Sequence, residues 1–323
     1  MHFVAHLFAG QLDALRQEKS RSGSIRLRGY DAATWVKPEL FDIKLPVNAI
    51  AYNLCPTSRD LYLERVEGSR APQTWERYTG KVIDSTYKAI HRKCEEYFFK
   101  HASLKCSLPQ YLARSKKRII EYAKNEHAQD FNNIRPIPNQ SRIRQLEDTL
   151  KKIIMSETSL ASSLLDVEVS KIDGANAKGI FEEYLSFNTD LVLKSLHLGF
   201  SEKATPDFVY RHEVMGDIKT GKWYEFFLYT AIAYVLAYED HTRKDIDYGV
   251  ILHPEFPRRK KIPIYGHTNI RFIDDRLRHA FIAIRDRKLQ IIKEGKDPGK
   301  PDSKDKCDSE CPFVQECWGG END

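Results

Sequence analysis

The sequence lacks an uninterrupted apolar run of about 18 residues, the length at which a stretch is read as a membrane-spanning helix. Residues 1–10 also lack the basic start and the small-residue cleavage site of a secretory signal peptide. No internal repeat is visible along the 323 residues. We therefore expect a cytoplasmic protein with no membrane partner, in which disulfide bonds are rare.

The excess of one charge sign is also small. Lys and Arg number 51 against 46 Asp and Glu, which leaves a net charge of +5 at pH 7. This balance permits an acidic partner such as nucleic acid but does not require one. Basic clusters with aromatic residues between them suit single-stranded DNA, although each cluster alone is also typical of a solvated helix face. The basic clusters are Arg114–Arg118, Arg142 and Arg144, Arg258–Lys261, and Arg276, Arg278, Arg285 and Arg287, and the aromatic residues are Tyr111, Tyr122, Trp223 and Tyr224.

The hydrophobic pattern divides the chain into a mainly helical first half and a mixed second half. Helices are predicted over Arg59–Val66, Trp75–Lys100, most of 101–165 with breaks at Pro136 and Pro138, Tyr224–Tyr238 and Asp275–Lys293. Strands are predicted at Leu165–Ile172, Leu191–Leu198, Phe208–Val209, Val214–Lys219 and Tyr248–Leu252. This mixture predicts an α/β (α+β) fold.

Two carboxylates and a lysine stand on a predicted hairpin that turns near Arg211–Glu213. Asp207 precedes the first strand, and Asp217 and Lys219 share one face of the second because side chains at i and i+2 point the same way. A hard divalent cation, Mg²⁺ or Mn²⁺, relieves the repulsion between two such carboxylates. It also lowers the pKa of a bound water, while a nearby lysine can stabilise charge on phosphorus. The alternative is a solvated strand edge carrying an ion pair.

The residues Pro206-Asp207 and Gly216-Asp217-Ile218-Lys219-Thr220-Gly221 resemble motifs of the RecB-type PD-(D/E)xK nucleases. The resemblance implies a restriction-endonuclease-like core in which Asp207 and Asp217 bind metal and Lys219 activates or positions the attacking water. Tyr234 matches the tyrosine of the family's Q-x-x-x-Y helix and joins the expected catalytic set. Thr230 stands where that family has glutamine.

The first motif of the same family is G-x-x-x-H. Residues Gly80 to Asp84 fit its spacing, with Asp84 at the position of the histidine, so the resemblance makes Asp84 a third metal ligand. His91 lies two helical turns further on and is a second choice for that ligand.

Cysteines gather near the end of the chain as Cys307, Cys311 and Cys317. Their spacing in a short, loop-rich tail indicates a metal site, either tetrahedral or an iron–sulfur cluster, with a disulfide as the alternative. A distant cysteine is needed to complete four ligands. Cys55, with Arg and Tyr after it, is one candidate, and Cys94 and Cys106 look more like free thiols.

One cysteine before the nuclease motifs and three after them resemble the CRISPR-associated Cas-four family, and within it the Csa-one-like branch. The resemblance runs from about Val47 to Trp318. It implies a [4Fe–4S] cluster held by Cys55, Cys307, Cys311 and Cys317, with zinc as the alternative because the first two tail cysteines are three residues apart rather than two. Such a cluster would tie distant parts of the chain together and act structurally rather than in redox chemistry.

The resemblance also implies an organisation and a role. The expected parts are an N-terminal segment (1–48), a cluster domain formed by 49–70 with 300–323, a helical region with the first motif inserted at 71–165, and the nuclease core at 166–299. The expected activity is exonucleolytic cleavage of single-stranded or frayed DNA ends in CRISPR adaptation, an antiviral defence, beside the CRISPR integrase and other adaptation proteins. Self-association into a homo-oligomer stays open. The alternative functions are a RecB-like repair nuclease and a non-catalytic iron–sulfur DNA-binding subunit.

Overall fold

A five-stranded mixed sheet forms the centre of the protein in the computed structural model, which describes all residues except 101–106, 172–176, 196, 202–203, 258 and 320–323. Its strands lie in sequence order: β1 (Phe187–Asn188), β2 (Phe208–Tyr210), β3 (Val214–Ile218), β4 (Tyr248–Leu252) and β5 (Ile270–Phe272). Only β3 and β4 run parallel, and helix α10 (Leu228–Thr242) connects them. Every residue of β3 and β4 is buried because helices cover both faces of the sheet.

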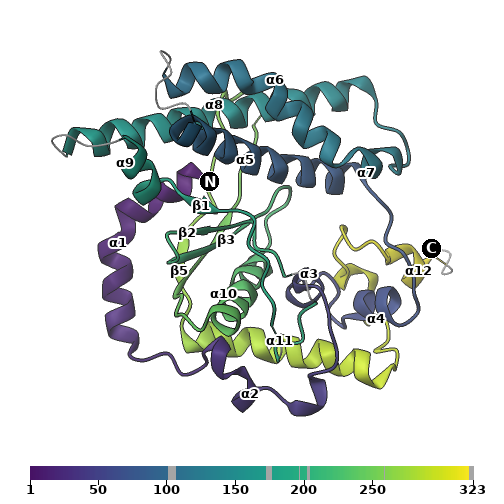
Figure 1. Cartoon of the computed structure of the whole chain (residues 1–323). Helices are drawn as coiled ribbons and strands as arrows, with labels where there is room; N and C mark the ends of the chain where they lie inside the picture. The colour runs from purple at the N-terminus through teal and green to yellow at the C-terminus, as the bar shows by residue number, and fades with distance from the viewer. Residues whose placement is uncertain (101–106, 172–176, 196, 202–203, 258, 320–323) are drawn as a thin grey trace.

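The helical layer on one face of the sheet contains α1 (His2–Ser22), α5 (Trp75–Lys100), α6 (Leu108–Glu126), α7 (Ala128–Asn132), α8 (Gln140–Lys171) and α9 (Ala177–Tyr184) (Figure 1). Phe208, Val214 and Ile218 point from the sheet into this layer's apolar core. The opposite face receives Val209 and Met215 and packs against α10 and α11 (Asp275–Glu294). The alternation along β2 and β3 thus builds two cores on a three-layer α/β arrangement.

Shorter elements complete the chain. They are α2 (Ala32–Trp35), α3 (Val47–Ala51), α4 (Arg59–Arg65) and α12 (Val314–Trp318), with the 3-10 turns η1 (Gly29–Asp31), η2 (Pro38–Leu40), η3 (Glu225–Phe227) and η4 (Lys304–Lys306). Helices α4 and α12 lie side by side although about 250 residues separate them (Figure 1). Tyr62 and Leu63 of α4 pack there against Phe313. None of the described helices is long and apolar enough to cross a membrane.

Several predicted elements are confirmed. The hairpin of β2 and β3 turns at Arg211 and His212, both at positive φ. Helix α5 has the predicted bounds, and α10, α11, α4 and β4 lie close to theirs. The mixed α/β class is also confirmed.

Two predicted strands are wrong. Leu165–Lys171 belongs to the long helix α8, while Ile172 lies outside the described residues. Buried residues at 153, 154, 157, 161, 164 and 165 follow the helical period rather than alternation. In Leu191–Leu198, the described residues form no strand, and only Leu193 makes an isolated bridge, to Ala204.

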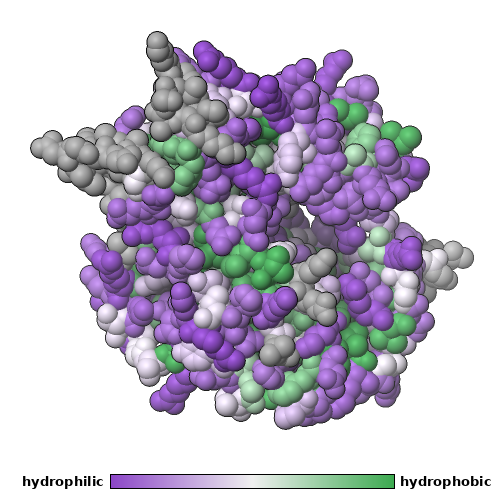
Figure 2. All heavy atoms as spheres, in the orientation of Figure 1, coloured by the Kyte–Doolittle hydropathy of each residue, from purple (hydrophilic) through white to green (hydrophobic). Residues whose placement is uncertain are grey.

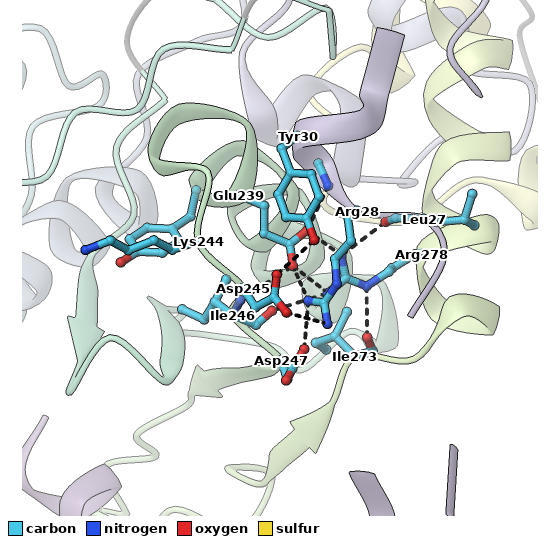
Figure 3. A network of polar contacts seen from close by, with 12 residues as sticks. Leu27, Arg28, Tyr30, Glu239, Lys244, Asp245, Ile246, Asp247, Ile273 and Arg278 are labelled. Atoms are coloured by element: carbon cyan, nitrogen blue, oxygen red, sulfur yellow. Dashed lines mark hydrogen bonds and ion pairs between the residues drawn. The ribbon is translucent and has the colours of Figure 1, made fainter. Parts of the chain in front are cut away.

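A buried ionic network attaches the segment after α1 to the core (Figure 3). The Glu239 carboxylate on α10 has no exposed surface and accepts hydrogen bonds from Arg28, Arg278 and the backbone of Gly29 at 2.5–3.0 Å. Arg28 also forms an ion pair with Asp247, just before β4. Two guanidinium groups that share one buried carboxylate hold three distant stretches of chain in register.

Arg278 and Arg285 therefore lie neither on a nucleic-acid surface nor on a solvated helix face, the two interpretations of their basic cluster. Both side chains are fully buried. Arg285 donates to the backbone carbonyls of His197 and Leu198 at 3.0 and 2.6 Å. Their guanidinium groups satisfy internal acceptors, which a basic periodicity in the sequence cannot distinguish from an exposed face.

Candidate active site

A pocket of about 850 Å³ opens between the first half of α5, the end of β3 and the segments around α4 and α12. Figure 2 shows the surface hollowed between the helical layer and the part of the molecule that carries α4 and α12. The residues predicted from the motifs all line this pocket: Asp84, Asp207, Asp217, Lys219 and Tyr234. The structure therefore brings together one side chain from α5, one from the loop before β2, one from β3, one from the residue directly after β3 and one from α10.

The hairpin fixes Asp207 against Asp217. The backbone N–H of Ile218 donates to the Asp207 carboxylate at 2.7 Å, so the carboxylate is held one residue from Asp217. Gly216 faces Phe208 across the two strands, and a Cβ at residue 216 would lie 2.0 Å from the Phe208 ring. Only glycine allows this ring to cross the strand, which explains the residue before Asp217 in the motif.

Lys88 lies between two of the carboxylates. Its ammonium is 2.9 Å from Asp84 Oδ2, one helical turn away on α5, and 2.9 Å from Asp207 Oδ1. Burial opposes the charge on Lys88, but Asp207 and Asp84 outweigh it and raise its pKa above the ordinary value. Burial opposes the charge on Asp207 in the same way, and the facing Lys88 is the main reason that its pKa is nevertheless lowered.

Asp84 and Asp217 are less well compensated. Burial and the neighbouring Asp207 raise the pKa of Asp84 well above the usual range, despite Lys88. Asp84 Oδ1 is buried and has no hydrogen-bond partner among the described residues. Burial raises the pKa of Asp217 to about 6, with Asp207 adding to the shift and Lys219 opposing it. The two lysines do not fully offset the repulsion among the three carboxylates, so a further positive charge would stabilise their ionised forms.

Lys219 is the second lysine that contacts a carboxylate of the site, and it remains a cation. Its Nζ lies 2.5 Å from Asp217 Oδ2, and its backbone N–H donates to Leu252 of β4 at 3.0 Å. Burial works against the charge, but Asp217, Tyr52 and Asp207 raise the pKa of Lys219 well above its ordinary value. A lysine in this state stabilises negative charge or orients water rather than removing a proton near neutral pH.

Three further residues of the site were not predicted in these roles. Thr230, at the position of the family's glutamine, is fully buried and lies 2.5 Å from Asp217 Oδ2, so it supports the carboxylate rather than facing the pocket. Tyr52, in the loop after α3, lies under Lys219, with its ring centroid 5.5 Å from Nζ. Lys88 could have been found, because residues four apart on a helix share a face. Nothing in the local sequence connects Tyr52 to Lys219.

His91 is not brought to the pocket. It is buried in the core of the helical layer, where its Nε2 lies 2.8 Å from the carbonyl oxygen of Phe187. His91 lies two turns beyond Asp84 on α5, so it contacts the first strand of the sheet instead of the carboxylates. Asp84 is therefore the only one of the two candidates for the first motif that lines the pocket.

The four cysteines of the predicted cluster gather where α4 meets the C-terminal segment. Cys311 and Cys317 pack against the apolar group of Tyr62, Leu63 and Phe313. Burial raises the pKa of Cys317, with Cys55 and Cys307 close enough to add to the shift against Arg59. Burial likewise raises the pKa of Cys311 to about 11, with Cys55 and Cys317 among the contributors.

Polar donors point at the sulfur atoms of this group. Arg59 Nη1 lies 3.5 Å from Cys317 Sγ, and Trp318 Nε1 lies 3.3 Å from Cys307 Sγ. Such donors stabilise thiolates. The five cysteines that the structure describes form no disulfide. Cys94 is buried in the helical core as a free thiol, as predicted, and Cys106 lies outside the described residues.

The donor chemistry of both groups suits the ions expected for them. Carboxylate oxygens, one of them buried without a partner among the described residues, suit Mg²⁺ or Mn²⁺, and four neighbouring thiols suit an iron–sulfur cluster or zinc. In the described part of the chain, no three His, Cys, Asp or Glu side chains are already arranged around a common metal position. At the carboxylates, the ammonium of Lys88 stands between two of the three.

Comparison with known proteins gives a family. The family model described as CRISPR-associated exonuclease Csa1 matches residues 6–320. A protein of Saccharolobus solfataricus named CRISPR-associated exonuclease Csa1 is 22% identical over 293 residues, which cover 90% of this chain and 91% of that protein. A crystal structure of a candidate exonuclease from Eubacterium rectale covers 59% of this chain and 70% of its own, at 12% identity and a TM-score of 0.31. Because the family model matches nearly the whole chain, this protein belongs to the Csa1 family of CRISPR-associated exonucleases.

Proposed function

We propose that this protein is a Mg²⁺- or Mn²⁺-dependent DNA exonuclease of the PD-(D/E)xK type that acts on single-stranded or frayed ends. The observation that carries the proposal is the convergence of Asp84, Asp207, Asp217 and Lys219 in one pocket from separate elements. Membership of the Csa1 family supports the nuclease class and its CRISPR role. The expected step is the trimming of DNA for the CRISPR integrase during adaptation.

The side chains of the pocket divide the work. Asp84, Asp207 and Asp217 would hold the metal, which when bound polarises the scissile phosphate and acidifies a water. Lys219 remains cationic and stabilises the charge that builds up on phosphorus. Thr230 fixes the orientation of Asp217 from behind. Tyr234 lines the pocket with most of its surface buried, and it packs in the apolar core behind the hairpin.

The wall beyond Lys219 suits unpaired nucleotides. The rings of Tyr224 and Phe226 are half-buried, stack with centroids 4.8 Å apart and line the same pocket. Lys222 Nζ lies 4.8 Å from the centroid of the Tyr224 ring. An aromatic surface with a cation beside it accepts bases of any sequence by stacking. Asp308 holds this wall by accepting from Tyr224 at 2.7 Å and Lys222 at 3.1 Å, which ties it to the segment of Cys307.

The cysteine group is proposed to hold a [4Fe–4S] cluster, with zinc as the alternative. Cys55, Cys307, Cys311 and Cys317 would be the ligands, and the cluster would fasten α4 to α12 beside the pocket. Its role is structural, because it joins segments far apart in sequence. Anaerobically purified protein with the cluster should show a broad absorbance band at about 400 nm, which is typical of iron–sulfur proteins. A colourless protein with one equivalent of zinc would favour the alternative.

The activity is tested by replacing Asp217. Asp217→Ala should abolish Mn²⁺-dependent release of nucleotides from end-labelled single-stranded and frayed DNA. Asp302→Ala is the matched control, because Asp302 is highly exposed, pairs only with Lys306 among the described contacts and lies outside the pocket. Undiminished cleavage by Asp217→Ala would contradict the assignment of the site, and cleavage of blunt duplexes as fast as of single strands would contradict the substrate.

A further inference from the structure

The position of Lys88 bears on how many metal ions the proposed site can take. Lys88 contacts two carboxylates from different elements, Asp84 on α5 and Asp207 before β2, each at 2.9 Å. Its side chain is mostly buried, as are those of both partners. A cation fixed between two carboxylates at this distance occupies the space that a bridging divalent ion would need.

The oxygens of the three carboxylates differ in how many hydrogen bonds and ion pairs they already make. Asp207 has both engaged, Oδ1 by Lys88 and Oδ2 by the N–H of Ile218. On Asp217, Oδ2 contacts Lys219 and Thr230. Asp84 keeps one buried oxygen, Oδ1, with no hydrogen-bond partner among the described residues. The oxygen without a partner therefore belongs to Asp84, whereas Asp207 and Asp217 contact each other as well as their lysines.

The charges of the pocket agree with this geometry. Around the proposed metal position, Asp84, Asp207 and Asp217 in their ionised forms contribute −3, and Lys88 and Lys219 contribute +2, which leaves −1. One divalent ion brings the sum to +1, and the scissile phosphodiester, with one negative charge, then makes the filled site neutral. A second divalent ion would leave +2 in a mostly buried pocket, which is costly.

We propose that Lys88 takes the place of a second divalent cation, so that the site binds a single Mg²⁺ or Mn²⁺. The inference rests on the proposed function and deepens it. A covalently attached ammonium cannot acidify a water as a metal does, but it supplies fixed positive charge and up to three donors to ligands and phosphate oxygens. A single ion would supply the water chemistry when bound, and Lys88 would keep Asp84 and Asp207 in place.

The test counts the Mn²⁺ ions bound to the full chain by electron paramagnetic resonance. The number that the Asp217→Ala variant still binds is subtracted from the count for each protein. Wild-type protein should bind one Mn²⁺ at the site. Lys88→Met should bind a second ion, or bind the first about tenfold more tightly or better, because a positive charge next to the ligands is removed. Lys88→Arg, which keeps the charge, should retain one ion at close to wild-type affinity.

Lys81→Met is the matched control. Lys81 lies on the same helix and lines the same pocket, but it pairs with Asp130, outside the site, at 2.8 Å. Its stoichiometry should equal that of the wild type. Two ions in the wild type, or one ion with unchanged affinity in a folded Lys88→Met, would overturn the inference alone. Equal binding by wild type and Asp217→Ala would instead overturn the proposed metal site.

Discussion

Thr230 offers the sharpest test of how the site is supported. Its hydroxyl lies 2.5 Å from Asp217 Oδ2, and the residue is fully buried. Thr230→Val keeps the shape and removes the hydroxyl, which also lies 2.7 Å from the carbonyl oxygen of Phe227, while Asp217 Oδ2 keeps its contact with Lys219. A hydrogen bond to a charged group contributes about 1.5–3 kcal/mol. At about 1.4 kcal/mol per tenfold, this corresponds to a loss of about 10- to 150-fold.

The loss should appear in Mn²⁺ affinity or in the single-turnover rate of DNA cleavage, because both depend on the orientation of Asp217. Thr230→Ser, which keeps the hydroxyl and loses a methyl group, should stay within about threefold of wild type. Thermal unfolding should show both variants folded. Wild-type rate and metal affinity in a folded Thr230→Val would refute the view that Thr230 positions Asp217.

Three further outcomes are expected. Glu239→Ala should lower the free energy of unfolding in urea by about 3–5 kcal/mol, because it leaves the buried Arg278 without its carboxylate; a loss under about 1 kcal/mol would count against the network. Burial lowers the pKa of Lys288 from 10.5 to about 8, so the unfolded chain binds more protons between these values and stability should rise from pH 8 to pH 10.5. Lys288→Met should lack that rise, and an equal rise in both proteins would exclude the explanation. Tyr52→Phe keeps the ring under Lys219 but removes the buried hydroxyl, which lies near Lys219 and Asp217. This variant should slow single-turnover cleavage about tenfold with little change in DNA affinity. A change in DNA affinity alone would contradict a role through Lys219.

The parts of the site that could be predicted are those encoded over a short range. Asp207, Asp217 and Lys219 lie on one hairpin, so the strand period alone puts them on neighbouring positions of one face. The contribution of Gly216 is equally local, because it depends on one cross-strand neighbour, Phe208.

The parts that could not be predicted depend on contacts between distant segments. Tyr52 contacts Lys219 across about half of the chain, and the buried Arg278 looks like a surface charge until Glu239 is placed beside it. The apolar run at Leu165 fits a strand or a helix equally well, and the helical period of α8 becomes clear only over its full length. The edge strands β1 and β5 are two and three residues long, too short to show any alternation.

The residues that line the pocket are synthesised at widely separated times. Tyr52 and Asp60 emerge early from the ribosome, whereas Glu310, Pro312 and Phe313, which line the same pocket, emerge about 250 residues later. A nascent chain that stops short of these residues has the carboxylates but lacks one side of the pocket. Folding of the site must also wait for contacts of very high sequence separation, which are slow to form. The pocket is therefore complete only after the chain has been made past residue 313.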